Sequence, residues 1–590
     1  MSAELDYSSS EESNKVENNA VTTKKEYTQK YINNGSMLSM DSSNPNVIEV
    51  FKDGSVKDDH VKFPNTEDLL FDKKNNWKDH IGIILISLLI SFGGFLYGWD
   101  LGYIGGLLGM ENFKQYFGTY NAVKDSYSFN NSKTGAIVAM FSFGASFGGI
   151  ILSDLPNKYG RKIALASVTL IYIVGNLVQI TCTKNKHAWI QLIIGRLIAG
   201  FGYGGVASTA PLLLGETAPA KLRSICVSFY QLSVTLGVFL GKCTNYNTRK
   251  YADSSSAQWR VQIGLCFFWA LLVIVGIAFV PESARYYVQQ DRIEDARKTL
   301  TILNNVPGDD PLLQRELDTL VYAMEAEKLV KSNGVKDLFS TKNKIIQRMI
   351  NGIILQSCQQ LTGSIYFLYY GTLVFKAVGL SDSYTTSIII GFVNFGSTFF
   401  TFFFVHRWGR RGVLLVGAVV MCICMLVYAC VGSQSLYPHG KDSPTSKTAG
   451  NVMIAFTCIS IFTYSTTWAP LTFVVCSESY PLSIKSLCMS INIGIHMIWA
   501  AMISFFTPFI TGAIHFYYGF VFMGCLIFSI FFVYFFVPET KDLTLEEVNE
   551  LWLTELPAWK TPNWVPYARR GGNYQEETEN SSKKGLKKFF

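Results

Sequence analysis

Four carboxamide side chains lie inside strongly apolar stretches of the sequence, where polar groups are costly. A carboxamide both donates and accepts hydrogen bonds, so a group of them can bind a ring of hydroxyls without ionic contact. An isolated amide in such a stretch can equally bridge two helices. The four amides are Gln231, Gln359, Gln360 and Asn394, and the nearby aromatic candidates for the apolar face of such a ring are Phe473, Trp468 and Tyr366.

Two charged residues, Asp100 and Arg196, also fall within apolar stretches. A charge in such surroundings is a candidate for function by default, either in coupling or in gating. The structural alternative is an ion pair that steadies the fold, and the sequence leaves both readings open.

The elements that must position these side chains are membrane-spanning helices. The 590 residues are 49% hydrophobic and only 16% charged, and the charge gathers between long apolar stretches. Stretches of about 20 apolar residues are long enough to cross the hydrocarbon layer. We therefore predict an all-α membrane protein with twelve transmembrane helices, at residues 81–103, 134–154, 162–182, 187–208, 224–242, 262–280, 349–370, 385–405, 412–431, 452–477, 487–510 and 515–537.

The distribution of Lys and Arg predicts the orientation. Residues 1–80 are polar and contain no apolar targeting segment, so we expect a disordered cytoplasmic tail. Lys73, Lys74 and Lys78 before the first span favour a cytoplasmic amino terminus, and an even number of spans then places both termini there. The loop 243–261 is an exception, because it is predicted to be external although it is basic.

Several function classes lack support in the sequence. The twelve Cys are scattered without a His cluster, which indicates neither a metal site nor disulfides. The net charge of +7 lies mostly at predicted cytoplasmic helix ends, so it indicates topology rather than nucleic-acid binding. The apolar spans exclude a soluble enzyme, and no nucleotide-binding loop supports ATP-driven transport. We expect no cofactor, no enzyme activity and no obligate protein partner. Asn130, in an external Asn-x-Ser sequence, is a possible glycosylation site.

Three short motifs occur twice, in the same order. Residues 157–162 resemble 406–411, the Glu216 to Arg223 spacing resembles Glu478 to Lys485, and Pro281-Glu282-Ser283 resembles Pro538-Glu539-Thr540. Such a tandem repeat predicts two six-helix bundles related by an axis along the membrane normal. The expected parts are an amino-terminal bundle at 81–280, a cytoplasmic helical linker at 281–348, a carboxy-terminal bundle at 349–537 and a cytoplasmic tail at 538–590.

The repeated charges predict a breakable contact on the cytoplasmic face. Arg and Lys pair with carboxylates or with helix carboxyl ends, and such pairs can hold two bundles together while that face is closed. The alternative is that the basic residues are simple topology anchors. The candidates are Arg161, Glu216, Arg223, Glu282, Arg410 and Glu478.

These motifs resemble those of the sugar porter family of the major facilitator superfamily, and within it the fungal hexose transporters. The resemblance spans about residues 81–570 and rests on Gly98-Trp99-Asp100, Gly195–Gly200, Gly215–Pro219, Pro281–Tyr286, Gln359–Gly363, Tyr369–Thr372, Ser477–Pro481 and Pro538–Thr544. It implies the major facilitator fold and transport of a monosaccharide by alternating access. It also implies that the four amides contact the sugar.

Two positions depart from the family pattern. Ser364-Ile365 stands where fungal hexose carriers generally have two Asn, and His496-Met497 stands where an Asn-Trp pair is usual. Losing a buried hydrogen bond costs about 1 kcal/mol, so these changes bear on which sugar is bound. His496 is therefore a candidate that either bonds a sugar hydroxyl or packs.

Together these features predict a plasma-membrane hexose carrier that works by facilitated diffusion. A proton-coupled symporter is the nearest alternative, because the resemblance implies that the Asp100 and Arg196 pair couples protons in some relatives. A non-transporting sugar sensor is another, disfavoured by the short tail of about 50 residues after Pro538.

Overall fold

The computed structural model describes residues 81–566 with short gaps, and four strands nearer the amino terminus. The gaps are 123–124, 186, 219, 252–254, 305, 309, 330–343, 378–382, 402–408, 437–445, 482–483, 542, 544 and 555. The chain divides into two compact units, Met1–Lys73 and Lys74–Phe590.

The first unit contains a small antiparallel sheet. Its strands are β1 (Met37–Met40), β2 (Val47–Lys52), β3 (Ser55–Val56) and β4 (Val61–Lys62), and β2 pairs with the other three. This differs from the prediction of a wholly disordered tail. The strand β2 has the sequence VIEVFK, whose β-branched and aromatic residues favour a strand. The other residues of 1–80 lie outside the described part.

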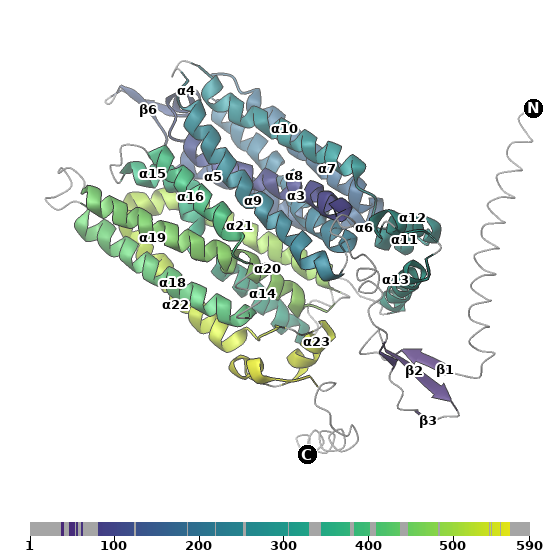
Figure 1. Cartoon of the computed structure of the whole chain (residues 1–590). Helices are drawn as coiled ribbons and strands as arrows, with labels where there is room; N and C mark the ends of the chain where they lie inside the picture. The colour runs from purple at the N-terminus through teal and green to yellow at the C-terminus, as the bar shows by residue number, and fades with distance from the viewer. Residues whose placement is uncertain are drawn as a thin grey trace, which may run out of the picture. The chain divides into compact units, whose positions relative to one another are not determined.

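The second unit begins with six long helices (Figure 1). They pack mainly as α3 against α9, α5 against α8 and α7 against α8. Between α3 and α5 lie the short helix α4 (Glu111–Phe117) and a hairpin of β5 (Thr119–Asn121) and β6 (Ser126–Ser128). The six helices are α3 (Ile81–Leu107), α5 (Asn131–Ile151), α7 (Arg161–Ile180), α8 (Ala188–Thr217), α9 (Ala220–Thr248) and α10 (Ala257–Phe279).

The second half repeats this plan, but two of its spans are broken. Span seven is divided into α14 (Ile345–Gln360) and α15 (Ser364–Ala377) at Gly363, whose φ of 85° suits glycine. Span ten is divided into α19 (Lys447–Thr466) and α20 (Trp468–Ser479). The other spans are α16 (Ser383–Thr398), α18 (Arg410–Cys430), α21 (Lys485–Ile514) and α22 (Tyr518–Phe536).

The helices have the length and apolar surface of membrane spans. In the described part of the chain, eight helical segments are long and apolar enough to cross a membrane, and the last, Leu487–Phe536, contains both α21 and α22. The three predicted spans outside these segments coincide with α9, with the divided α14 and α15, and with α16. The predicted fold class, an all-α membrane protein of twelve spans in two bundles, is confirmed.

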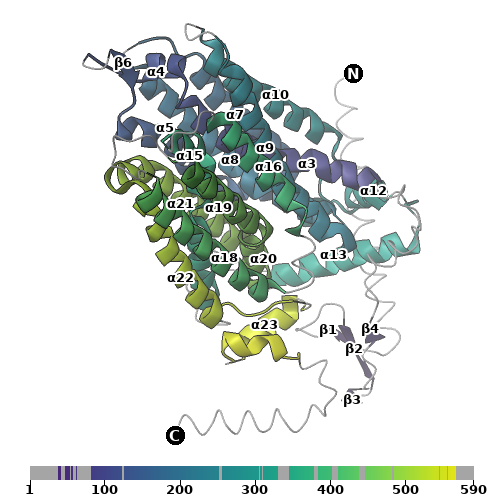
Figure 2. The same cartoon turned by 60° about the vertical axis from the view of Figure 1, so that its left-hand side comes forward.

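Short helices lie at one end of the bundles (Figure 2). Between the halves, α11 (Ala284–Gln289), α12 (Ile293–Asn304) and α13 (Pro311–Leu329) share a small apolar core of their own. After α22 come α23 (Leu545–Leu553) and a 3-10 turn at Ala558–Asn563. We call this the connector end, and the opposite end, where β5 and β6 lie, the hairpin end.

Candidate functional site

Gln359 joins the two broken spans. Its Nε2 donates to the carbonyl oxygens of Trp468 (3.2 Å) and Ala469 (3.0 Å) at the start of α20. These carbonyls lie beside the break between α19 and α20, and the amide is completely buried. Both N–H groups of Gln359 are therefore used by the fold itself.

His496 on α21 meets this amide from the other side. Because the Gln359 nitrogen donates to carbonyls, its oxygen must accept, and His496 Nδ1 lies 3.1 Å from it. The hydrogen of the ring is thus assigned to Nδ1, which also lies 3.3 Å from Gln356 Oε1. Gln360 Nε2 lies 2.9 Å from Nδ1 and 2.7 Å from Nε2 of the ring, and because Nδ1 carries the hydrogen, it donates to Nε2. The contacts describe a neutral imidazole held by three glutamines of α14.

An aromatic ring completes this cluster. The Phe473 ring lies 5.2 Å from that of His496, centre to centre, and is only partly buried. Gln360 Oε1 is buried and has no hydrogen-bond partner. We call Gln356, Gln359, Gln360, Phe473 and His496 the glutamine cluster. It combines amides, an imidazole and a ring, which suits a neutral ligand rich in hydroxyls.

The other two predicted amides lie nearer the contact between the halves. Asn394 on α16 accepts a hydrogen bond from the hydroxyl of Ser465 on α19. One turn later, Thr398 Oγ1 donates to Thr235 Oγ1 of the first half at 3.2 Å. Gln231 lies one turn before Thr235 on α9 and is partly exposed. The structure thus places Gln231 and Asn394 on helices that meet across the two halves.

Two predicted aromatic residues face elsewhere. Trp468 is fully buried, and its Nε1 donates to the Leu414 carbonyl of α18 at 3.0 Å. The Tyr366 hydroxyl lies 3.2 Å from that of Tyr428, also on α18, and its ring packs on α22. Both side chains are used in packing inside the second half, so the prediction that they offer a ring to the ligand does not fit these contacts.

Asp100 and Arg196 form a two-pronged ion pair inside the first half. Arg196 Nη1 and Nη2 donate to Asp100 Oδ1 and Oδ2, each at 2.9 Å, and both side chains are buried. The guanidinium also lies over the Phe141 ring of α5 at 5.5 Å. The pair therefore ties α3, α5 and α8 together, as the structural reading of these charges requires.

The two halves are joined by hydrogen bonds towards the hairpin end. The Tyr369 hydroxyl of α15 lies 3.3 Å from Ser142 Oγ, and the Tyr384 hydroxyl of α16 donates to the Gly106 carbonyl at 2.9 Å. Gly105 lets α3 approach the backbone of α15, since a Cβ there would overlap the Tyr369 carbonyl. The hairpin end of this structure is closed.

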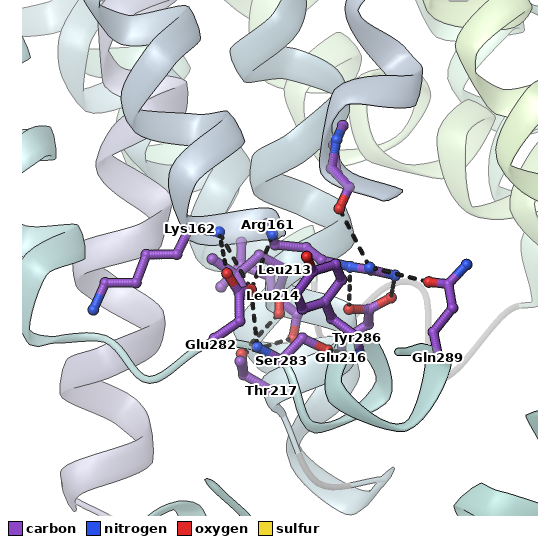
Figure 3. A network of polar contacts seen from close by, with 11 residues as sticks. Arg161, Lys162, Leu213, Leu214, Glu216, Thr217, Glu282, Ser283, Tyr286 and Gln289 are labelled. Carbon is purple, nitrogen blue, oxygen red and sulfur yellow. Dashed lines mark hydrogen bonds and ion pairs between the residues drawn. The ribbon is translucent and has the colours of Figure 1, made fainter. Parts of the chain in front are cut away.

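At the connector end, the repeated motifs build a polar network in the first half (Figure 3). Arg161 donates from Nε and Nη2 to the two oxygens of Glu216, each at 2.9 Å. The Glu282 carboxylate accepts from the backbone N–H groups of Arg161 (2.9 Å) and Lys162 (3.1 Å) at the start of α7. A carboxylate at a helix amino terminus is favoured by the free N–H groups and the helix dipole.

The second half has the same arrangement at the start of α18. Glu539 accepts from the backbone N–H groups of Arg410 (2.9 Å) and Arg411 (3.1 Å). The Arg410 side chain donates to Glu478 at 3.1 Å, and Glu478 also accepts from the Thr540 hydroxyl at 2.6 Å. The duplication inferred from sequence is therefore a duplication of structure.

The predicted contact between the halves is not formed by these residues. Among the described residues, the hydrogen bonds of these side chains stay within one half or the segment that follows it; this holds for Arg161, Glu216, Glu282, Arg410 and Glu478. The pairs instead fasten the start of one helix to the end of another. Arg223 lies in α9, and its side chain is outside the described part of the chain.

Replacing Gly160 by Ala is expected to disrupt the network of the first half. Gly160 precedes α7 with φ at 94°, where other residues are strained, and an added Cβ would lie 2.5 Å from Glu282 Oε2. We expect a loss of about 1–3 kcal/mol in stability, measured as a lower melting temperature of the purified protein. The matched control is Gly412→Ala in α18, where an added Cβ meets nothing within 4 Å. Equal melting temperatures for the two variants would contradict this role.

Two polar residues of this region were missed from the sequence. Gln356 precedes Gln359 by one helical turn, a spacing that places both on one face. Lys242 is buried on α9, and its Nζ donates to the Leu368 carbonyl across the halves at 3.4 Å. The signal for Lys242 was a cation at the end of a predicted apolar span.

Asn130 is exposed and directly precedes α5 at the hairpin end. Its glycosylation stays a prediction. Among the described residues, no group of three or more His, Cys, Asp or Glu side chains is placed to hold a metal ion.

Comparison with known proteins agrees with this architecture. The sequence pattern of the family described as "Sugar (and other) transporter" matches residues 86–552. The galactose transporter of Saccharomyces cerevisiae is 50% identical over 504 residues, covering 85% of this chain and 87% of that protein. Hexose transporter 2 of Kluyveromyces lactis is 47% identical over 545 residues, covering 92% of this chain and 94% of that protein.

Solved structures show the same fold. The inward open conformation of the xylose transporter XylE from E. coli matches with a TM-score of 0.64 at 24% identity, covering 80% of this chain and 100% of that chain. XylE bound to 6-bromo-6-deoxy-D-glucose matches with a TM-score of 0.66 at 23% identity, covering 80% and 100%. By its sequence and its fold of two six-helix bundles, this chain belongs to the sugar transporter family of the major facilitator superfamily and is a multi-pass membrane protein.

Proposed function

We propose that this protein carries a hexose across the plasma membrane by facilitated diffusion and alternating access. The observation that carries the proposal is the glutamine cluster, a group of neutral hydrogen-bonding side chains beside an aromatic ring in the interior of a two-bundle carrier. Relatives named as galactose and hexose transporters support the substrate class.

The proposed cycle follows from the two ends of the molecule. In the structure, hydrogen bonds between the halves close the hairpin end, whereas the charged networks at the connector end stay within each half. Rocking of the bundles about the central residues would open the hairpin end and bring the connector ends together. This exposes the glutamine cluster and Gln231 first to one side of the membrane and then to the other.

The proposed orientation places both termini and the connector end in the cytoplasm. Basic side chains such as Arg161, Lys162, Arg410 and Arg411 lie at the connector end, as expected for the cytoplasmic ends of spans. The segment 281–348 is then a cytoplasmic linker, and Asn130 faces outside. The partners in this proposal are a monosaccharide and the lipid bilayer.

The ion pair in the first half favours facilitated diffusion over proton symport. Both carboxylate oxygens of Asp100 are bonded to Arg196, so proton binding there would have to break a buried ion pair. Proton symport would also make the medium alkaline when substrate is added.

The test is uptake of labelled hexoses by a yeast strain that lacks its own hexose carriers. Cells with this protein at their surface are expected to take up at least one hexose without alkalinisation of a weakly buffered medium. Uptake equal to that of the empty strain would reject hexose transport, and alkalinisation would reject facilitated diffusion.

A further inference from the structure

We propose that His496 sets the sugar specificity of this carrier by occupying hydrogen-bonding groups of the glutamine cluster that would otherwise bind a sugar hydroxyl. The inference rests on the proposed function of this site. Its consequence is a carrier that tolerates the loss of one hydroxyl, so that its substrate class includes monodeoxy sugars.

The first step concerns Gln359, whose hydrogen-bonding capacity is used almost completely. Its two N–H groups go to the carbonyls of Trp468 and Ala469, and its oxygen accepts from His496 Nδ1. Only the second lone pair of that oxygen is left. Although the sequence makes Gln359 a candidate for sugar contact, in this arrangement it positions α20 and His496.

The second step concerns Gln360, which is fully buried beside the same ring. Its Nε2 donates to the ring nitrogen of His496 that carries no hydrogen. Its Oε1 is buried and has no hydrogen-bond partner. A buried carbonyl oxygen without a partner is costly, so it is a natural acceptor for one ligand hydroxyl.

The third step concerns Gln356, whose oxygen lies 3.3 Å from His496 Nδ1. Its amide nitrogen is also buried without an oxygen or nitrogen partner. The wall formed by α14 and α21 thus offers few strong polar groups to a ligand, because His496 has taken the others.

This arrangement predicts a pattern of substrate preference. A hydroxyl that finds no partner in a buried site loses its hydrogen bonds to water, so a sugar that lacks it loses nothing on binding. Wild-type protein is therefore expected to transport one monodeoxy analogue of glucose with a KM no higher than that of glucose, since only glucose loses the hydrogen bonds that this hydroxyl makes to water.

The two variants that test this are His496→Asn and His496→Gln. An Asn amide nitrogen takes the place of Nδ1, which lies 2.9 Å from Gln360 Nε2, and still donates to Gln359. Two amide nitrogens are both donors, so Gln360 Nε2 is then left without an acceptor. A Gln side chain is longer, and its oxygen takes the place of the accepting ring nitrogen, so that Gln360 stays occupied. The Gln variant is therefore the matched control, and each ratio of analogue to glucose is measured within one variant, which removes differences in expression.

The experiment measures KM and Vmax for D-glucose and its monodeoxy analogues in cells, and the shift in melting temperature that each sugar gives to the purified full-length protein. In His496→Asn, the KM of the tolerated analogue divided by the KM of glucose is expected to rise about five- to tenfold. The reason is that glucose gains a hydrogen bond that the analogue cannot form. In the His496→Gln control, the ratio of the analogue KM to the glucose KM should stay at the wild-type value.

Unchanged ratios in His496→Asn, by uptake and by melting temperature, would overturn the inference. Changed melting-temperature ratios without uptake would support the role of His496 and reject the transport function. If no sugar is taken up and none shifts the melting temperature of any variant, the cluster is not a sugar site and both proposals fall.

Discussion

The Asp100→Asn variant is expected to lose nearly all transport, because Arg196 would remain as an unpaired cation inside the first bundle. Both side chains are buried and joined by two hydrogen bonds of 2.9 Å. Breaking a buried pair by removing one partner costs about 3–5 kcal/mol. The measurement is the melting temperature of the purified protein together with its amount at the cell surface and hexose uptake.

Two comparisons separate this effect from a general loss of acidic residues. Glu111 pairs with Lys114 at 2.7 Å but is 49% exposed, and an exposed pair contributes at most about 1 kcal/mol, so Glu111→Gln should be close to wild type. Adding Arg196→Gln to Asp100→Asn removes the stranded charge and should restore part of the stability. Wild-type stability and uptake in Asp100→Asn would contradict the structural role of the pair.

The second large effect is expected for Gly105→Ala, which should block closure of the hairpin end. The added Cβ would overlap the Tyr369 carbonyl oxygen across the two halves. Such an overlap with backbone costs about 3 kcal/mol in the closed state only. This lowers the ratio of closed to open molecules by about 100-fold, and transport is expected to fall with it.

Sugar binding from the hairpin side should persist in Gly105→Ala, because the variant disfavours one state and leaves each bundle intact. The matched control is Gly396→Ala, another helical glycine of a span, where an added Cβ meets nothing within 4 Å. Uptake by Gly105→Ala at the rate of Gly396→Ala would show that the closed hairpin end is not part of the cycle.

The fold and its symmetry could be predicted from sequence because they depend on patterns of many residues. A span needs about 20 apolar residues of any type, so the spans are recognisable without knowledge of their packing. The paired motifs around Glu282 and Glu539 lie at equivalent helix starts in the two halves. The positions of Gln359, Gln360 and His496 in the interior also followed from the spans that carry them.

The direction of each side chain could not be predicted where a span is broken. Trp468 begins α20 directly after the break, and its ring nitrogen donates to α18. The sequence shows neither the break nor the direction of this side chain. The same applies to Tyr366, which lies just beyond the break at Gly363 and whose hydroxyl meets Tyr428 of α18. The role of Arg161 and Glu216 also needed coordinates, since the sequence cannot tell a contact within a half from one between halves.

The sequence also could not predict that Gln359 uses nearly all of its hydrogen-bonding groups within the protein. Gln359 donates to two backbone carbonyls of a helix far away in the sequence. The residue types in a sequence do not show which backbone groups a side chain will meet. A sequence motif therefore makes the residue a candidate but does not show which partners use its hydrogen-bonding groups.

The most direct test of the account is hexose exchange by the purified protein in liposomes. Liposomes preloaded with an unlabelled transported hexose are expected to take up the labelled sugar transiently above its external concentration. Liposomes without preloading should fill only to the external concentration, with or without a proton gradient. Absence of exchange for every monosaccharide would contradict the carrier, and accumulation driven by the proton gradient would contradict facilitated diffusion.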